Sequence, residues 1–351
     1  MTGRGRERAG GRERTGGRVL VVGNAIADVG LVVPALPEPG GDVLATSTAV
    51  TAGGAFNALA AASRDGAVAV HVGILGTGPF ASLVAAALES EGVLSLERRV
   101  PDRDTGFSVV LVDPTSERTF VTSVGAEGML EPSDLQGVEV EPTDVVLVSG
   151  YSLAHPANAS LVPAWLEALP ESVRVVFDPS PLIATLPRAA LARVLARTDV
   201  VSANAREARL WSGRGVHPAD AAALSGPALS GPALSEPARA ASALAALLSR
   251  PGSAALVRDG ADGCVLATGS TVQRIAGFAV EAVDSTGAGD AHCGVLCAAL
   301  ARGVTLPEAA RRANAAAALA VARRGPATAP TAAETDLLLG AGLPPTGDGT
   351  R

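Results

Sequence analysis

The sequence predicts an α/β fold with a doubly wound, mostly parallel sheet and a small second sheet beside it. Short apolar runs such as residues 18–23 and 143–148 end in glycine or polar residues, which is typical of buried parallel strands. Helical segments separate these runs, as parallel crossovers require. Residues 29–50 and 100–124 instead carry Pro–Gly turns and alternating β-type residues, so we expect them to form the small sheet.

Composition restricts the chemistry. The 351 residues can bury a large core, but aromatics make up only 3%, so Ala, Val and Leu must fill it. The chain has no lysine, which excludes a Walker-type P-loop because that mechanism needs a lysine on the phosphates. A net charge of −7 argues against a nucleic-acid partner.

The cysteines and the hydropathy pattern predict a cytoplasmic protein without a membrane partner. Cys264, Cys293 and Cys297 form no CxxC pair and are expected to be buried thiols in a reducing compartment. No apolar stretch reaches the length of a membrane span, and residues 1–17 lack the apolar segment of a signal peptide.

The most informative stretch is VDSTGAGDAHCGVLCAAL, residues 283–300. Gly287, Ala288 and Gly289 have little or no side chain, so their backbone N–H groups can converge at the start of the following helix and form an anion cradle. Asp284 precedes this run and Asp290 closes it. A carboxylate at an anion cradle indicates a base that deprotonates an attacking hydroxyl. The alternative is an ordinary glycine-rich turn with a capping Asp.

The run D-S-T-G-A-G-D at residues 284–290 resembles the C-terminal signature of the ribokinase-like (PfkB) carbohydrate and nucleoside kinases. The resemblance implies that Asp290 is the catalytic base and that the amides of Gly287, Ala288 and Gly289 form the anion hole for the transferred phosphoryl group. It also implies that the small sheet is a lid over the sugar and the surface of a homodimer.

A second stretch, TAGGAFNALAAASRDG at residues 51–66, resembles the N-terminal signature of the same family. The resemblance implies that Gly53 and Asn57 bind the acceptor hydroxyls together with Asp28, although Asp28 alone is also compatible with a simple turn. The sequence departs from the ribokinase pattern at Ile26 and Phe56. These apolar residues suggest an acceptor bulkier or less hydroxylated than ribose.

The resemblance also extends to the nucleotide end of the site. It implies that Asn204 and Glu207, an N-x-x-E motif, organise Mg²⁺ and the phosphates of ATP, with Glu207 holding the ion through water. An ordinary helix cap with a first-turn Glu is the alternative. Arg258 is the candidate charge beside the transferring phosphate, and Gly260 and Asn314 are the remaining predicted ATP contacts.

A monovalent cation such as K⁺ is an open hypothesis. Backbone carbonyls near Asp284, Thr286 and Gly325 are its candidate ligands, and carbonyl ligands leave no side-chain trace in a sequence.

A competing motif is G-x-G-x-x-A at residues 76–81, with Glu97 where a ribose-binding acid of a dinucleotide site would lie. Pro79 and Phe80 enter this turn, and the unit is not the first βαβ of the sheet. We therefore expect a packing turn rather than an NAD site.

The predicted organisation is a disordered lead-in at residues 1–17, one kinase domain at residues 18–342 and a disordered tail at residues 343–351. Residues 224–240 form a Pro/Ser/Ala repeat, predicted to be a low-complexity surface insertion. The expected activity is ATP-dependent phosphorylation of a sugar hydroxyl with Mg²⁺. A nucleoside kinase, or a non-catalytic ligand-binding regulator on the same fold, remains an alternative.

Overall fold

The computed structural model describes residues 16–96, 98–115, 117–212 and 235–341. The predictions for residues 1–15, Glu97, residues 224–234 and residues 342–351 lie outside this part of the chain. Gly17 is anchored, because its N–H donates to the Ala301 carbonyl at 2.9 Å.

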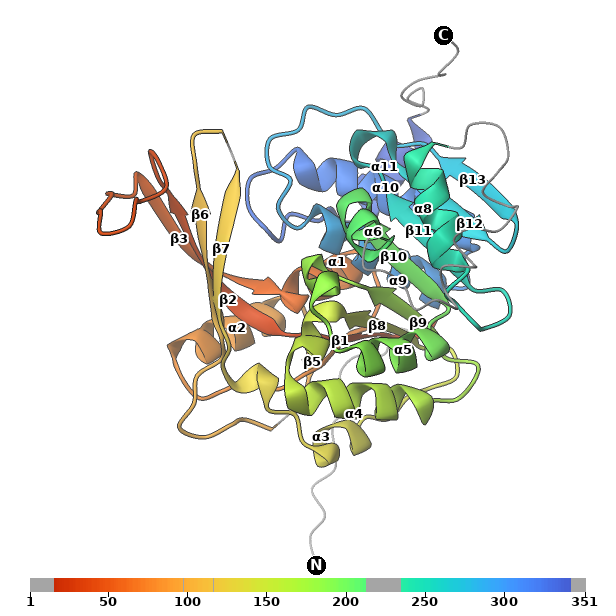
Figure 1. The fold of residues 1–351 in the computed structure, drawn as a ribbon, viewed down its shortest axis with the longest axis horizontal. Helices are drawn as coiled ribbons and strands as arrows, with labels where there is room; N and C mark the ends of the chain where they lie inside the picture. Colours follow the sequence, from red (N-terminus) through yellow and green to blue (C-terminus); the bar gives the residue numbers. More distant parts are fainter. Residues whose placement is uncertain (1–15, 97, 116, 213–234, 342–351) are drawn as a thin grey trace, which may run out of the picture.

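A large sheet forms the centre of the molecule in the order β13-β12-β11-β10-β9-β8-β1-β4-β5 (Figure 1). All neighbours from β5 to β11 pair in parallel, whereas β12 and β13 are antiparallel, which confirms the predicted mostly parallel sheet. The strands are β1 (Val19–Val22), β4 (Ala69–Val72), β5 (Leu94–Ser95), β8 (Val145–Ser149), β9 (Arg174–Asp178), β10 (Val200–Asn204), β11 (Ala254–Arg258), β12 (Cys264–Thr268) and β13 (Thr271–Ile275).

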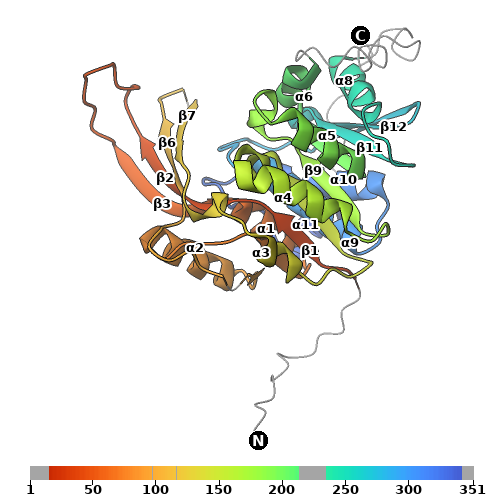
Figure 2. The ribbon, with the colours of Figure 1, turned by 60° about the horizontal axis from the view of Figure 1, so that its bottom comes forward.

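Helices cover both faces of this sheet (Figure 2). Alternate residues of β1 point to opposite sides: Val19 and Val21 pack in one core and Leu20 and Val22 in another. The first core contains residues of α1 (Ala55–Arg64), α2 (Pro79–Ser90), α9 (Ala288–Ala301) and α10 (Leu306–Val321), and α11 (Ala332–Gly340) contacts α10. The second contains residues of α3 (Pro132–Gln136), α4 (Pro156–Glu167), α5 (Arg188–Arg197), α6 (Ala205–Ser212) and α8 (Glu236–Ala245).

The small sheet has the order β3-β2-β6-β7 and stands away from the large domain (Figures 1 and 2). Its strands are β2 (Ala25–Val32), β3 (Ser47–Gly54), β6 (Phe107–Val112) and β7 (Arg118–Ser123). It extends beyond the predicted residues 29–50 at both ends. Only Gly23 and Asn24 separate β1 from β2, and β3 continues to Gly54. Asp28 therefore lies within the small sheet and not in a turn at the edge of the large one.

The predicted insertion at residues 224–240 is wrong at its C-terminal end, where Glu236–Ala240 belong to α8. The alanines of this segment pack well in a helix: Ala238 and Ala241, three residues apart, are buried and α8 contacts β11 and β12. Short 3₁₀ turns occur at η1 (Ala126–Gly128), η2 (Gly150–Ala154), η3 (Pro181–Ala184) and η5 (Gly260–Asp262). Among the described residues, no helix has the length and apolarity to cross a membrane.

Candidate active site

Polar residues gather at the carboxyl edge of the large sheet. The adjacent parallel strands β8, β9, β10 and β11 end in Ser149, Asp178, Asn204 and Arg258, respectively. Ligands of open α/β sheets bind at this edge, so the fold brings together residues that lie more than 100 positions apart in the sequence.

The glycine-rich run reaches the same edge at the N-terminus of α9. Gly287 precedes the helix in the left-handed conformation, with φ of 73°. A Cβ atom there would lie 1.9 Å from the Pro326 carbonyl oxygen, so glycine is required on both counts. Ala288 N–H donates to the Ser285 carbonyl in a long 3.3 Å bond, and Asp290 lies in the first turn.

Asn57 on α1 donates to Asp290 Oδ2 at 3.0 Å, which joins the two predicted signatures across 233 residues. Burial raises the pKa of Asp290 to about 7; the Asn57 hydrogen bond and Arg258 oppose the shift, and Asp178 and Asp28 add to it. Asn57 is buried, and its Oδ1 has no hydrogen-bond partner within the described part of the chain.

The Asp28 side chain reaches Gly53 diagonally across the β2–β3 pair, in which Gly53 is opposite Ile26 and Asp28 is opposite Thr51. A Cβ atom on Gly53 would lie 1.9 Å from Asp28 Oδ2, so the carboxylate lies directly over the glycine. Burial raises the pKa of Asp28 to about 6. The position needs a residue without a side chain because of Asp28, and the predicted contact of Gly53 with the acceptor hydroxyls stays a prediction.

Tyr151, directly after β8, shows how closely these groups converge. Burial raises its pKa to about 12, and the charges of Asp290, Asp178, Glu207 and Asp28 contribute in that order. One phenol is therefore within electrostatic reach of carboxylates from four different segments of the chain.

Arg258 lies beneath the first turn of α9. Its Nη1 donates to Asp178 Oδ2 at 3.1 Å and to Ser202 Oγ at 3.0 Å, and it contacts Cys293 Sγ at 2.9 Å. Burial alone would lower the pKa of Arg258, but Cys293, Asp178 and Glu207 together raise it, so the group stays charged. A Cβ atom on Gly289 would be 3.5 Å from Nη2, which places the guanidinium against the anion cradle.

Asn204 and Glu207 form a reciprocal cap at the start of α6. Glu207 N–H donates to Asn204 Oδ1, and Asn204 N–H donates to Glu207 Oε2, both at 2.8 Å. Burial and Asp178 raise the pKa of Glu207 to about 7, against the effects of Arg258 and Asn204. The ordinary cap geometry is thus present, and it directs the Glu207 carboxylate toward Arg258 Nη2, 3.5 Å away.

The donor set fits Mg²⁺ held mainly by phosphates and water. No group of three or more His, Cys, Asp or Glu side chains that could enclose a metal is found among the described residues. Mg²⁺ keeps several waters and typically takes one or two protein carboxylates. Glu207 Oε2 already accepts from Asn204 N–H and lies 3.5 Å from Arg258 Nη2, so the water-mediated role of Glu207 stays a prediction.

The remaining predicted nucleotide contacts lie beyond β11. Gly260 follows this strand, with φ of 58°, and is exposed. Asn314 on α10 is buried, and its amide donates to the carbonyls of Ile275 and Ala276 at 3.1 Å each. Asn314 therefore holds the end of β13 in place, and its contact with ATP stays a prediction.

Asp284 does not offer a free side chain to a monovalent cation. Its Oδ1 accepts from Thr286 N–H at 2.8 Å and from Arg118, and its Oδ2 accepts from Gly325 N–H at 3.0 Å. Burial alone would raise the pKa of Asp284, but these donors and the Arg118 charge lower it. The predicted cation would bind backbone carbonyls, which these side-chain hydrogen bonds do not involve, so it stays a prediction.

Two residues of the sequence argument have other roles. Phe56 is buried in the core with α9, so it does not line the acceptor site, while Ile26 is partly exposed.

The G-x-G-x-x-A turn caps α2 with a side chain: Asp104 accepts from the N–H groups of Phe80 at 3.1 Å and Ala81 at 2.8 Å. Asp104 thus takes the amides that a pyrophosphate would need, in agreement with a packing turn.

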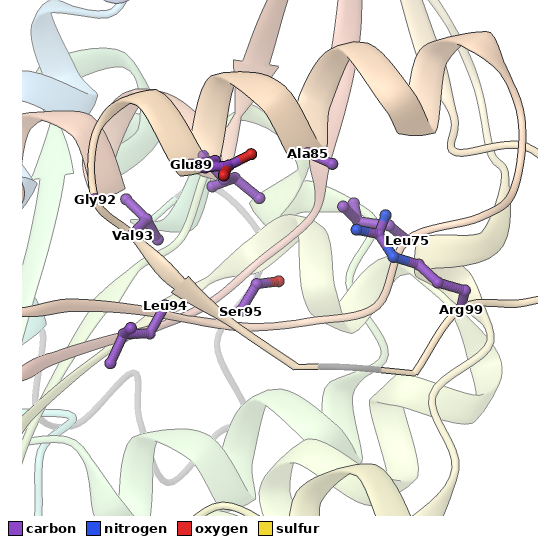
Figure 3. Close-up of a pocket in the computed structure, with 9 residues that line it drawn as sticks. Leu75, Ala85, Glu89, Gly92, Val93, Leu94, Ser95 and Arg99 are labelled. Carbon is purple, nitrogen blue, oxygen red and sulfur yellow. The ribbon is translucent and has the colours of Figure 1, made fainter. Parts of the chain in front are cut away.

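A pocket of about 350 Å³ lies elsewhere, between α2 and the sheet edge at β5 (Figure 3). Its lining includes the apolar residues Leu75, Leu88 and Val93 and the charged residues Glu89 and Arg99. None of the predicted site residues lines it.

The doubly wound sheet, the small sheet beside it and the glycine-rich helix N-terminus at the carboxyl edge define a ribokinase-like protein. In structure the chain is similar to the ribokinase of Thermotoga maritima, with a TM-score of 0.75 at 23% identity, covering 92% of this chain and 99% of that one.

Residues 17–333 match the pfkB family carbohydrate kinases. The sequence is 34% identical to the uncharacterized sugar kinase YegV of Escherichia coli K12, over 90% of this chain and 92% of that protein. It is 30% identical to a fructokinase of Escherichia coli, over 89% and 95%. The chain belongs to the pfkB carbohydrate kinase family and is a sugar or nucleoside kinase of that family.

Sequence reasoning missed two contributors to the site. Asp178 ends β9 and pairs with Arg258, and its position at a strand end in line with Asn204 was the available signal. Arg118 of the small sheet reaches Asp284, a contact that no spacing in the sequence indicates.

Proposed function

We propose that this protein transfers the γ-phosphate of ATP to a hydroxyl of a sugar or sugar-like acceptor, with Asp290 as the general base. The observation that carries the proposal is the meeting of Asn57 and Asp290 at 3.0 Å, because it puts the predicted acceptor-binding signature against the predicted base. A carboxyl group with a pKa of about 7 is well matched to deprotonating a hydroxyl near neutral pH.

The acceptor hydroxyls would bind between the small sheet and α1. Asp28 offers carboxylate oxygens, and the buried Asn57 Oδ1 needs a donor that the described residues do not supply. A polyhydroxylated acceptor provides such donors, and a buried acceptor atom left without one is costly.

The phosphoryl group would lie at the N-terminus of α9. There the amides of Gly287, Ala288 and Gly289 and the helix dipole favour negative charge, and Arg258 adds a guanidinium beneath them. Mg²⁺, when bound, would neutralise the phosphates of ATP, with Glu207 as its predicted water-mediated partner. Asn204, Gly260 and Asn314 are the proposed contacts of the remainder of ATP.

A nucleoside is the alternative acceptor. Partly exposed Tyr151 and Ile26 offer apolar surface near the acceptor carboxylates, whereas Phe56, one of the residues that suggested a bulky acceptor, lies in the core. With Phe56 in the core, the site has less apolar surface than the sequence suggested, which favours a sugar as the acceptor. A non-catalytic regulator on the same fold is less well supported, because Asp290 and its partner Asn57 are both in place.

A homodimer formed through the small sheet is also proposed. Four valines form a row across this sheet, since Val50 pairs with Val29, Val29 with Val109 and Val109 with Val121. Val50 and Val121, at the ends of the row, are 44% and 63% exposed, which leaves apolar surface for a second copy. Analytical ultracentrifugation of Val121→Arg should show a monomer, and an unchanged dimer would place the interface elsewhere.

The activity is tested by ADP release from Mg-ATP with a panel of pentoses, hexoses, sugar acids and nucleosides, beside Asp290→Asn. Turnover on an acceptor that the substitution abolishes supports both the reaction and the base. Binding of a panel compound without ADP release, unaffected by Asp290→Asn, would favour the regulator instead.

A further inference from the structure

A salt bridge joins the far end of the small sheet to the loop in front of the anion cradle. Arg118, the first residue of β7, donates through Nη2 to Asp284 Oδ1, and its Nη1 lies 3.4 Å from Ser285 Oγ. The two partners are 166 residues apart, and their side chains are only 17% and 18% exposed.

Asp284 organises the backbone around the cradle. Through Thr286 N–H it fixes the start of the glycine run, and through Gly325 N–H it fixes the loop after α10. These two loops are in tight contact, because Gly287 lies against the Pro326 carbonyl. A change at Asp284 would therefore move the amides that receive the phosphoryl group.

Arg118 lies on the face of the small sheet that carries Asp28. Val112 pairs with Arg118 and with Val32, and Ser108, four residues along β6, pairs with Asp28. Side chains alternate along a strand, so residues separated by an even number of positions share a face. Four residues correspond to about 13 Å along the strand. The acceptor carboxylate and the guanidinium thus lie on one surface of the sheet, offset by four residues along the strand direction.

We propose that Arg118 is a positioning residue for phosphoryl transfer, which docks the outer end of the small sheet onto Asp284 and thereby closes the acceptor site and holds the anion cradle in one arrangement. The proposal rests on the proposed kinase function. It assigns to a residue of the lid the positive charge at Asp284.

The first test needs no activity. Hydrogen exchange of the full chain without substrates is compared among wild type, Arg118→Ala and Arg103→Ala, where Arg103 is an exposed arginine of the same segment that donates to the Val124 carbonyl at 3.4 Å. Arg118→Ala should speed exchange in residues 107–123 and 283–287, while Arg103→Ala leaves residues 283–287 unchanged. Equal exchange in all three proteins overturns the docking.

The second test measures kcat and KM for the acceptor and for ATP. Arg118→Ala should lower kcat/KM for the acceptor by about tenfold, since closure and cradle geometry both suffer, and Arg118→Lys should recover part of it. The double variant Arg118→Ala/Asp284→Asn should lose no more activity than the less active of the two single variants, because both substitutions remove the same interaction. Losses that multiply, or kinetics of Arg118→Ala equal to those of wild type, overturn the proposal.

A third measurement separates a lost charge from a disturbed fold. Added guanidinium ion at millimolar concentration should restore activity to Arg118→Ala but not to Arg118→Ala/Asp284→Asn. If guanidinium restores activity to neither variant and Arg118→Ala does not speed hydrogen exchange, the assignment of Arg118 as a positioning residue is wrong. If wild type is inactive on every acceptor while its exchange pattern is as expected, the kinase proposal fails and the docking contact stands.

Discussion

Replacing Asp290 by Asn is the most direct perturbation of the proposed mechanism. Asn is nearly isosteric and can still accept the hydrogen bond from Asn57 Nδ2, so the arrangement around α9 should be retained. What is lost is the ability to take a proton. General base catalysis contributes about 10²- to 10⁴-fold, equivalent to about 3 to 5 kcal/mol of transition-state stabilisation, and we expect kcat to fall by this amount.

The pH dependence sharpens this expectation. With a pKa of about 7, the active carboxylate makes up about 9% of the molecules at pH 6 and about 91% at pH 8. The wild-type kcat/KM should therefore rise about tenfold over this interval and level off above it. The residual activity of Asp290→Asn should lack this rise.

The assay is coupled ADP release at saturating Mg-ATP from pH 5.5 to 9, with thermal unfolding of each variant. Asp262→Asn is the matched control, because Asp262 lies in η5 on the surface and pairs with Arg274, at 3.2 Å, in an exposed salt bridge. A variant that keeps more than about a tenth of wild-type kcat, with the same rise through pH 7, would refute the assignment of Asp290 as the base.

Three further outcomes are expected. Gly53→Ala should push the Asp28 carboxylate aside and raise the KM for the acceptor about 10- to 100-fold, with little change in the KM for ATP. Gly30→Ala is the control, because the nearest atom to its Cβ would be the Ala49 carbonyl oxygen at 3.7 Å. Equal KM values for the acceptor in the two variants would argue against Asp28 as a ligand. Arg258→Met should shift the pH profile of kcat/KM to higher pH, because Arg258 lowers the pKa of Asp290, and an unshifted profile would contradict this. The same substitution should reduce the free energy of unfolding by about 3 kcal/mol, because it leaves buried carboxylates unpaired. The carbonyl-bound cation predicts that replacing K⁺ by tetramethylammonium lowers kcat, and a change of less than about twofold would argue against it.

The sequence predicts those features whose cause is local. Gly287 has a φ of 73°, a backbone conformation that favours glycine, and the strand runs of β1 and β8 are buried on both sides. Such constraints act on the residue itself, so they leave a trace in residue type and spacing. The same holds for Asp290, whose position in the first turn of α9 follows from the glycine run before it.

Features that depend on distant partners could not be predicted. Nothing in the sequence distinguishes Arg118 from the other arginines, and its contact with Asp284 follows from the folding of the small sheet. Phe56 was expected beside the acceptor, but the packing of α1 against α9 buries it in the core. The lid boundary was wrong for a related reason: only the pairing of β2 with β3 and β6 assigns Ala25–Val32 to the small sheet.

The charge balance of the site explains why these distant contacts matter. Arg258 pairs with Asp178 and lies 3.5 Å from Glu207, and the pKa values of Asp28, Glu207 and Asp290 are raised, to between about 6 and 7. An anionic phosphate donor approaching this acidic centre needs positive potential, which here comes from the N-terminus of α9 and from the cation that accompanies ATP. Because helix-dipole effects fall off within one turn, the cradle works only if its amides are held in place. Fixing the loop in front of α9 through Asp284 is therefore as much a part of the site as the base itself.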